Sequence, residues 1–363
     1  MRRAVGCLYF TVLVFALSAE ADWLEEETGL VCTTFPASRY SVVDEQIVPE
    51  EGLFSYHPPG SRALEPSVLH TSVLGRGEVL KVGVTLNQRL SELSVRIVND
   101  ENVTVCRSSG FHLGSEASTE VWYCLVGVPT HVEGGVYRIV AEGHAGQRAF
   151  LYIGNTMVAE TEFASEQIVL DKELTELRKK PDPRKTEQAR QLWDVLIRFD
   201  PEAHYHTGEF AHPLALGRQS AGFGDIRTYL YYDGEQSRSI HNGLDLAAPS
   251  GTPVHAAAAG RVVFVRERIV TGKTVCLEHL PGVYSLYYHL STVAVSEEQI
   301  VEQGHEIGKV GSSGLATGAH LHWEIRVSGV AVDPLPFTTE KVIDTRLVSG
   351  IMDGESDTDL EGR

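Results

Sequence analysis

Hydrophobic and polar positions alternate in short runs over residues 30–153, and turn residues separate the runs. Clear examples are 79–84 (VLKVGV), 93–98 (LSVRIV), 121–126 (VWYCLV) and 136–141 (VYRIVA). A period of two is typical of strands that bury one face, and strands of this length and spacing indicate a β-sandwich. We therefore expect a β-sandwich domain over 22–160, immunoglobulin-like in topology. It carries no motif with recognisable chemistry, so we predict a spacer or targeting role.

The period then changes to that of helices. Residues 165–177 and 185–199 are rich in Glu, Lys, Arg, Leu and Gln, and Pro181-Asp182-Pro183 separates them, which a continuous helix would not tolerate. Apolar residues recur in the second segment at steps of three and four, which predicts one helix face: Ala189, Leu192, Trp193, Leu196 and Ile197. We expect a helical connector over 161–200 that packs against one or both neighbouring domains.

Strand patterns return from residue 201 to 337, now punctuated by glycine. They predict a carboxy-terminal antiparallel β domain over 201–340, so the whole chain is expected to be mainly β. From Ile343 onward acidic residues stand among small ones, and we predict a disordered acidic tail over 341–363.

The first 21 residues have the pattern of an export signal. Arg2 and Arg3 precede an apolar stretch over 7–17, and Ala19-Glu20-Ala21 offers a cleavage site before Asp22. The stretch is too short for a comfortable membrane span, although an uncleaved anchor is the alternative. We expect an exported protein with no stable membrane insertion once residues 1–21 are removed.

Composition limits the possible partners and the redox chemistry. The chain has 363 residues and a formal charge of −18, which argues against nucleic acid and against polybasic binding to anionic lipid. Four cysteines follow the predicted leader. In an oxidising compartment Cys106 and Cys124 could link two neighbouring strands, or they are two buried free thiols; sequence leaves both open.

Two histidine-rich segments carry the candidate chemistry. In 319–326 (AHLHWEIR) the even positions hold His320, His322, Glu324 and Arg326, whereas the odd positions are apolar. If this segment is a strand, both imidazoles face one cavity while the other face is buried. The same reasoning places Ser285, Tyr287 and His289 on one face of a strand over 283–290.

The second segment is 241–245 (HNGLD), where His241 and Asp245 are spaced to share a face in an extended or loop-edge conformation. A catalytic zinc ion usually takes three protein ligands from His, Asp, Glu and Cys, and leaves one position to water. His241, Asp245 and one histidine of the later pair would supply that set. The zinc-peptidase motif HExxH is absent, because Lys309 stands where His305-Glu306 would need a second histidine.

Several motifs in order resemble those of the lysostaphin- and LytM-type zinc metallopeptidases, bacterial enzymes that cut peptide bonds in peptidoglycan. They are GLDLAAPSGTPV at 243–254, AGRVV at 259–263, YHLS at 288–291, IGKVG at 307–311, TGAHLHWE at 317–324 and DP at 333–334. The resemblance covers about 201–337 and says nothing of the first 200 residues.

The resemblance implies that His241, Asp245 and His322 bind zinc and that His289 and His320 are the catalytic histidines. Zinc would activate water, one histidine would take its proton, and the other would steady the oxyanion. Which histidine does which stays open. The implied partner is peptidoglycan peptide, and the implied location is the periplasm or cell envelope of a bacterium.

We therefore predict an exported zinc metalloendopeptidase that hydrolyses peptidoglycan stem peptides or cross-bridges. The first alternative is a non-catalytic LytM-type activator of another wall hydrolase, although such relatives typically lack part of the metal set. The second alternative is a peptidase that acts on proteins.

Other residues keep structural interpretations. Tyr231 and Tyr232 are as well explained by packing as by an oxyanion role, and His279 is expected to be a structural turn residue. The cluster of His204, His206 and His212 could line or block the cleft, but a solvated linker is the preferred interpretation.

Overall fold

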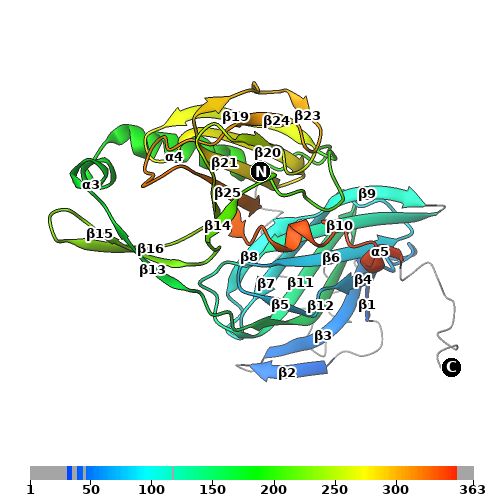
Figure 1. Cartoon of the computed structure of the whole chain (residues 1–363). Helices are drawn as coiled ribbons and strands as arrows, with labels where there is room; N and C mark the ends of the chain where they lie inside the picture. Colours follow the sequence, from blue (N-terminus) through cyan, green and yellow to red (C-terminus); the bar gives the residue numbers. More distant parts are fainter. Residues whose placement is uncertain (1–30, 35–38, 44–45, 117, 350–363) are drawn as a thin grey trace, which may run out of the picture.

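The computed structural model describes residues 31–34, 39–43, 46–116 and 118–349, and it is built mainly of antiparallel sheets (Figure 1). The predicted leader at 1–21 lies outside these residues. In Figure 1 a β-sandwich occupies the lower part of the molecule and a second β unit the upper part. The predicted mainly β architecture is confirmed.

Two sheets form the amino-terminal sandwich, and one core lies between them. Their strand orders are β1-β3-β12-β11-β7-β8 and β4-β6-β10-β9. Val82 and Val84 of one sheet share that core with Val95 and Ile97 of the other. The sandwich strands are β1 (Val31–Thr34), β2 (Arg39–Val43), β3 (Gln46–His57), β4 (Ser67–His70), β5 (Val73–Gly75), β6 (Val79–Leu86), β7 (Glu92–Val98), β8 (Thr104–Ser109), β9 (Phe111–Glu116), β10 (Thr119–Gly127), β11 (Gly135–Ala145) and β12 (Arg148–Ala159).

All four of the alternating runs quoted from the sequence are strands, namely β6, β7, β10 and β11. The sandwich itself agrees with the sequence prediction, whereas its immunoglobulin-like topology stays a prediction.

Cys106 and Cys124 are free, buried thiols. Cys106 lies in β8 and pairs with Ile97 of β7, whereas Cys124 lies in β10 of the opposite sheet and pairs with Val82 of β6. The two cysteines therefore do not sit on neighbouring strands of one sheet, and the proposed disulfide is absent. Burial raises the pKa of each thiol to about 12, so both stay protonated.

Strand β10 joins the sandwich to the carboxy-terminal unit. Its residues alternate: Cys124 and Val126 face the sandwich core, whereas Tyr123 and Leu125 belong to the core of the carboxy-terminal unit. Both faces of this strand are thus buried, and the two units share one continuous packed interface. At this interface the backbone N–H of Asp344 donates to the Tyr123 hydroxyl at 3.0 Å.

The connector differs from the sequence prediction at its start. Residues 165–169, expected to be helical, form β13 (Ser165–Val169), which pairs in parallel with β15 (Ile226–Leu230). Its residues alternate between exposed and half-buried, a period of two that suits a strand and not a helix. Pairing with β15 outweighs the weak helix preference of Glu and Gln.

Two helices follow, as the proline pair requires. They are α3 (Lys172–Lys179), capped by the Asp171 carboxylate, and α4 (Pro183–Leu196), which begins with Pro183 at its first position and is capped by Asp182. Leu192, Val195 and Leu196 of α4 are buried against the carboxy-terminal sheet.

The apolar face of α4 is partly as predicted. Leu192 and Leu196 are buried, but Ala189 is exposed, and Trp193 and Ile197 are each about half exposed, at 50% and 51%. Val195, which the spacing argument had left out, takes their place in the contact. The buried stripe is therefore rotated around the helix from the predicted one, toward Val195.

The carboxy-terminal unit is built on the sheet β14-β17-β25-β21-β20-β19-β23, with β26 paired to β25. Smaller sheets, β13-β15-β16 and β18-β24-β22, flank it. Its elements are β14 (Arg218–Ala221), β15, β16 (Gln236–Ile240), β17 (Leu244–Ala247), β18 (Pro253–His255), β19 (Gly260–Arg268), β20 (Gly272–Leu280), β21 (Val283–Leu290), β22 (Thr292–Val293), β23 (Ile300–Val301), β24 (Glu306–Lys309), β25 (His320–Val327), β26 (Val330–Val332), the 3-10 helix η1 (Pro336–Thr338) and α5 (Arg346–Ser349).

The chain stays packed beyond residue 341, where the sequence predicted a tail. Val342 and Ile343 are buried in the carboxy-terminal core, and α5 lies against β6 of the sandwich. The rest of the predicted tail, 350–363, lies outside the described residues.

His279 has a structural role, as expected, but it is not in a turn: it lies fully buried in β20. Its Nδ1 lies 2.7 Å from the Ala259 carbonyl, and its Nε2 lies 2.7 Å from the Ser285 hydroxyl. Burial lowers its pKa from 6.5 to about 4; the Ala259 hydrogen bond opposes this shift and nearby His206 adds to it.

This burial predicts a pH dependence of stability. Between pH 6.5 and 4 the unfolded chain protonates His279 but the folded chain does not, so the free energy of unfolding falls as pH falls, by about 3 kcal/mol from this residue. Urea titrations at pH 7 and pH 4 measure this change in the free energy of unfolding. Because other groups also titrate, the comparison is with His279→Gln, whose stability should change less with pH; equal changes would contradict the assignment.

Candidate metal centre

Strand β25 presents its polar residues on one face. Leu321, Trp323 and Ile325 are fully buried in the carboxy-terminal core. On the other face the His322 ring is 2.9 Å from Glu324 Oε1, and Glu324 Oε2 accepts from Arg326. The alternation expected from the sequence is confirmed.

His241 and Asp245 reach the same place from the neighbouring chain segment. His241 follows β16, and Asp245 lies in β17, where it pairs with His322 of β25. Gly243 allows this approach, because a Cβ at residue 243 would lie 2.3 Å from the Trp323 carbonyl oxygen. A backbone contact this close admits no side chain.

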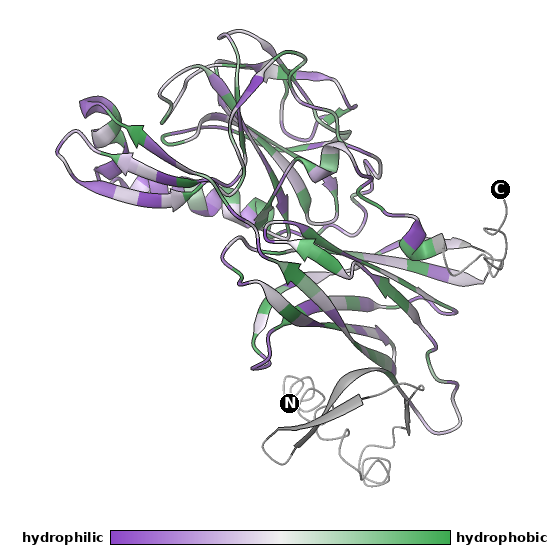
Figure 2. Cartoon of the chain, turned by 60° about the horizontal axis from the view of Figure 1, so that its bottom comes forward, coloured by the Kyte–Doolittle hydropathy of each residue, from purple (hydrophilic) through white to green (hydrophobic). Residues whose placement is uncertain are grey.

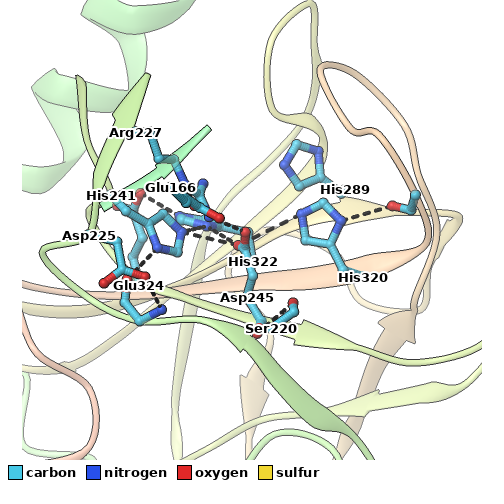
Figure 3. A network of polar contacts seen from close by, with 12 residues as sticks. Glu166, Ser220, Asp225, Arg227, His241, Asp245, His289, His320, His322 and Glu324 are labelled. Atoms are coloured by element: carbon cyan, nitrogen blue, oxygen red, sulfur yellow. Dashed lines mark hydrogen bonds and ion pairs between the residues drawn. The ribbon is translucent and has the colours of Figure 1, made fainter. Parts of the chain in front are cut away.

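Three ligand atoms converge here, as Figure 3 shows. His241 Nε2 lies 2.9 Å from His322 Nδ1 and 3.1 Å from Asp245 Oδ1, and His322 Nδ1 lies 2.8 Å from Asp245 Oδ1. All three residues are buried. Ligands at tetrahedral angles around zinc are separated by about 3.3 Å, so small adjustments would accommodate the ion.

The outer ring nitrogens explain why these three atoms need a cation. His241 Nδ1–H donates to the Gly222 carbonyl at 2.6 Å, and His322 Nε2–H donates to Glu324. In the neutral rings the inward nitrogens are then lone-pair acceptors, and they face each other beside a carboxylate. Such a convergence of acceptors is satisfied by a positive charge, which either a metal ion or a proton can supply. The donor set fits a zinc ion with two imidazoles and one carboxylate.

The charge states of His322 and Asp245 agree with this. Burial lowers the pKa of His322, but Asp245 and Glu324 raise it by more, to about 9. Burial raises the pKa of Asp245, yet the histidines lower it by more, so it stays well below its usual range.

The second carboxylate oxygen of Asp245 binds Arg227. The sequence analysis did not predict a role for Arg227. Arg227 Nη2 donates to Asp245 Oδ2, and Arg227 Nε donates to Glu166. Arg227 lies in β15 and Glu166 lies opposite it in β13. This contact leaves Oδ1 of Asp245 free to face the two histidines. Glu324 could have been found from the alternation of β25, but the role of Arg227 depends on strand pairing that no local pattern shows.

His289 reaches the site by a route that differs from the prediction. Ser285 and Tyr287 do share a face, since the Ser285 hydroxyl donates to the Tyr287 hydroxyl at 3.0 Å. His289 does not join them. Lys273 pairs with Leu290 and Val275 with Tyr287, so β21 carries one extra residue here, and His289 has a φ of 59°. This β-bulge turns the imidazole to the opposite face of the sheet, beside His320.

His289 and His320 form a pair next to His241, Asp245 and His322. Their ring centroids are 4.8 Å apart, and His320 Nε2 lies 3.7 Å from Asp245 Oδ1. His289 Nδ1–H donates to the Ser313 carbonyl and His320 Nδ1–H to the Gly318 carbonyl. A cavity of about 260 Å³ lies over all five residues. The structure therefore brings together the five residues that the resemblance implies for the site, namely His241, Asp245, His289, His320 and His322.

The remaining candidates lie elsewhere. His204 packs edge-on against Phe111 of the sandwich, and His206 packs against Phe210. Tyr232 is 70% exposed, and the Tyr231 hydroxyl contacts Arg178 and Ser237.

Comparison with known proteins agrees with the motifs. Residues 239–334 match Peptidase family M23. The DD-carboxypeptidase/endopeptidase Mpg of Neisseria meningitidis serogroup B is 41% identical over 123 residues, which are 34% of this chain and 27% of the relative. The peptidoglycan DD-endopeptidase ShyA of Vibrio cholerae is 40% identical over 95 residues, 26% of this chain and 22% of the relative.

A crystal structure of an M23 peptidase from Pseudomonas aeruginosa aligns with 72% of this chain and 94% of its own, at 24% identity and a TM-score of 0.48. This chain spans about a quarter of the length of the curated relatives named above. Its carboxy-terminal unit contains a peptidase M23 domain, and the resemblance inferred from the motifs is confirmed.

Proposed function

We propose that this protein is a zinc-dependent endopeptidase that hydrolyses peptide bonds of peptidoglycan. The observation that carries the proposal is the convergence of His241, Asp245 and His322, with His289 and His320 beside them over one cavity. The proposed ligands are His241 Nε2, Asp245 Oδ1 and His322 Nδ1. When bound, zinc would supply Lewis-acid chemistry, polarising water and the peptide carbonyl.

His320 is the proposed proton acceptor. Its Nδ1–H is held by the Gly318 carbonyl, so in this tautomer the lone pair is on Nε2, which points toward the site near Asp245. His320 is half-buried, so it carries the positive charge at lower cost than buried His289 does.

His289 is the proposed neutral partner. Burial lowers its pKa to about 3, and the neighbouring His320 adds to the shift. A neutral ring held by the Ser313 carbonyl stays in one orientation while His320 changes its charge. Its inferred role is to orient water and substrate beside the ligands.

Peptidoglycan is proposed as the substrate because relatives of this domain are named peptidoglycan DD-endopeptidases. The proposal includes export to the periplasm or cell envelope, which rests on the predicted leader at 1–21. In the described part of the chain, no helix combines the length and the apolar character that crossing a bilayer requires.

Digestion of purified peptidoglycan tests the function. The full chain with one zinc ion should release soluble fragments, and a chelator or His320→Ala should stop the release. Wall binding without fragment release would favour a non-catalytic activator, and cleavage of casein but not of the wall would favour a general protease. Either result would overturn the proposal.

Glu324 is expected to tune zinc affinity. It accepts from His322 Nε2–H and is itself held by Arg326, so Glu324→Gln weakens the donor strength and the orientation of the ligand. Loss of such a supporting contact typically lowers metal affinity by about 10- to 100-fold. Competition with a chromophoric chelator measures the change, with exposed Glu302→Gln as the matched control. Equal affinities for both variants would contradict the role.

A further inference from the structure

The cavity over the metal centre has one wall made by the connector, outside the segment that matches the peptidase family. Ile168, Leu170 and Arg178 of the connector line the cavity, together with Thr317 and His320 of the family-matching segment. Figure 1 shows β13, β15, β16 and α3 projecting together from the body, and Figure 2 shows that this projection is largely hydrophilic. A substrate in the cavity therefore meets residues of the connector.

Arg178 of α3 is held in a fixed position on this wall. Its guanidinium carbon lies 3.7 Å from the centroid of the Tyr229 ring, a stacked cation–π contact. Its Nε donates to the Tyr231 hydroxyl at 3.1 Å. These two contacts fix the plane of the guanidinium and leave its two terminal NH2 groups for another partner.

The neighbouring cations differ from Arg178 because carboxylates neutralise them. Lys179 pairs with Asp233 and Glu235, and Arg227 pairs with Asp245 and Glu166. Among the described residues, no carboxylate forms an ion pair with Arg178. A preorganised arginine without an acidic partner, in a chain of formal charge −18, is suited to bind an anion from outside.

Strand β15 connects Arg178 to the metal centre through Tyr229 and Arg227. Arg227 and Tyr229 lie two residues apart on β15, so their side chains share a face about 7 Å apart. Arg227 contacts the ligand Asp245, and Arg178 stacks on Tyr229. The guanidinium therefore lines the same cavity as the five site residues and is connected to the metal centre through Tyr229 and Arg227 of one strand.

We infer that Arg178 binds a free carboxylate of the peptide substrate and selects peptides that carry one near the cleaved bond. This inference rests on the proposed function for its substrate class. In a stem-type pentapeptide, the carboxylate comes either from the carboxy-terminal D-alanine or from the α-carboxyl of γ-linked D-glutamate. A bidentate contact with a planar guanidinium suits both.

Binding, not turnover, tests the inference. The zinc-loaded full chain carrying His320→Ala is titrated with a synthetic pentapeptide, L-Ala-γ-D-Glu-L-Lys-D-Ala-D-Ala, and with two analogues, each amidated at one of the two carboxyls. Adding Arg178→Gln should weaken binding of the free-acid peptide about tenfold or more, as expected for loss of a charged hydrogen-bonded pair. One of the two amidated analogues should bind the protein that keeps Arg178 as weakly as the free-acid peptide binds the Arg178→Gln protein. Arg178→Gln should not weaken binding of that analogue any further, and this identifies the carboxylate that Arg178 binds. Lys179→Gln, the neighbouring neutralised cation, should leave all three affinities unchanged.

Equal losses for the free acid and both analogues would assign Arg178 a structural role and overturn the inference. The inference would also be overturned if Arg178→Gln did not change the affinity for the free-acid peptide, or if the protein that keeps Arg178 did not measurably bind this peptide. Failure of the proposed function is distinct: the wild type would then release no wall fragments, whatever the affinities.

Discussion

Replacing His241 with alanine is expected to remove the bound metal and to lower peptidoglycan hydrolysis by at least about 1,000-fold, since the reaction depends on the chemistry that zinc supplies. The wild type should carry about one zinc ion per chain. Without the His241 ring, one carboxylate and one imidazole remain, and His322 Nδ1 returns to its hydrogen bond with Asp245. Two ligands hold zinc far more weakly than three.

Metal analysis of the purified protein and fragment release from peptidoglycan measure the two effects together. His305→Ala is the matched control, because His305 is an exposed histidine in a turn of the same domain and should keep both zinc and activity. A His241→Ala protein that retains one zinc ion per chain and full activity would remove the basis of the proposed centre.

Replacing His320 with alanine is expected to lower kcat by about 100- to 10,000-fold, which is the usual contribution of a positioned proton acceptor. Unlike the change at His241, this one should leave zinc content and affinity nearly unchanged. The reason is geometric: His320 Nε2 approaches only Asp245 Oδ1, at 3.7 Å, and lies outside the set of three close atoms.

Single-turnover rates and metal analysis on the same sample separate the two roles. His289→Ala serves as the comparison, since it removes the neighbouring ring and also leaves the three ligands in place. If His320→Ala lost its zinc, the residue would be a ligand and not a proton acceptor. If it hydrolysed the wall at the wild-type rate, the proton acceptor would have to be another group.

Local periodicity was enough to predict much of this site. The alternation over 320–326 identified which residues of β25 face the cavity, because a strand segregates its side chains whatever it pairs with. The spacing of His241 and Asp245 allowed a shared face in an extended or loop-edge conformation, whereas the close approach of two strands at Gly243 became visible only in the structure. Motif order then joined these pieces into one site.

Predictions from the sequence were weaker where the conformation of a segment depends on the strand with which it pairs. Residues 165–169 have a composition that suits a helix, yet they form β13 because β15 offers an edge to pair with. Cys106 and Cys124 are in strands, as expected, but these strands belong to opposite sheets. Neither outcome can be calculated from residues close in sequence, since both depend on which strands become neighbours.

The sequence by itself determined most strands of the two β units and the presence of two connector helices, because hydrophobic period and proline position are local properties of the chain. The order of the motifs, through their resemblance to a known family, pointed to the five residues of the candidate site. The tertiary structure decided what those residues can do together. A bulge re-aims His289, strand pairing brings Arg227 and Glu166 onto Asp245, and the fold of the connector sets Arg178 beside the cavity. Each of these depends on contacts between segments distant in the chain, whose free energy exists only in the packed molecule.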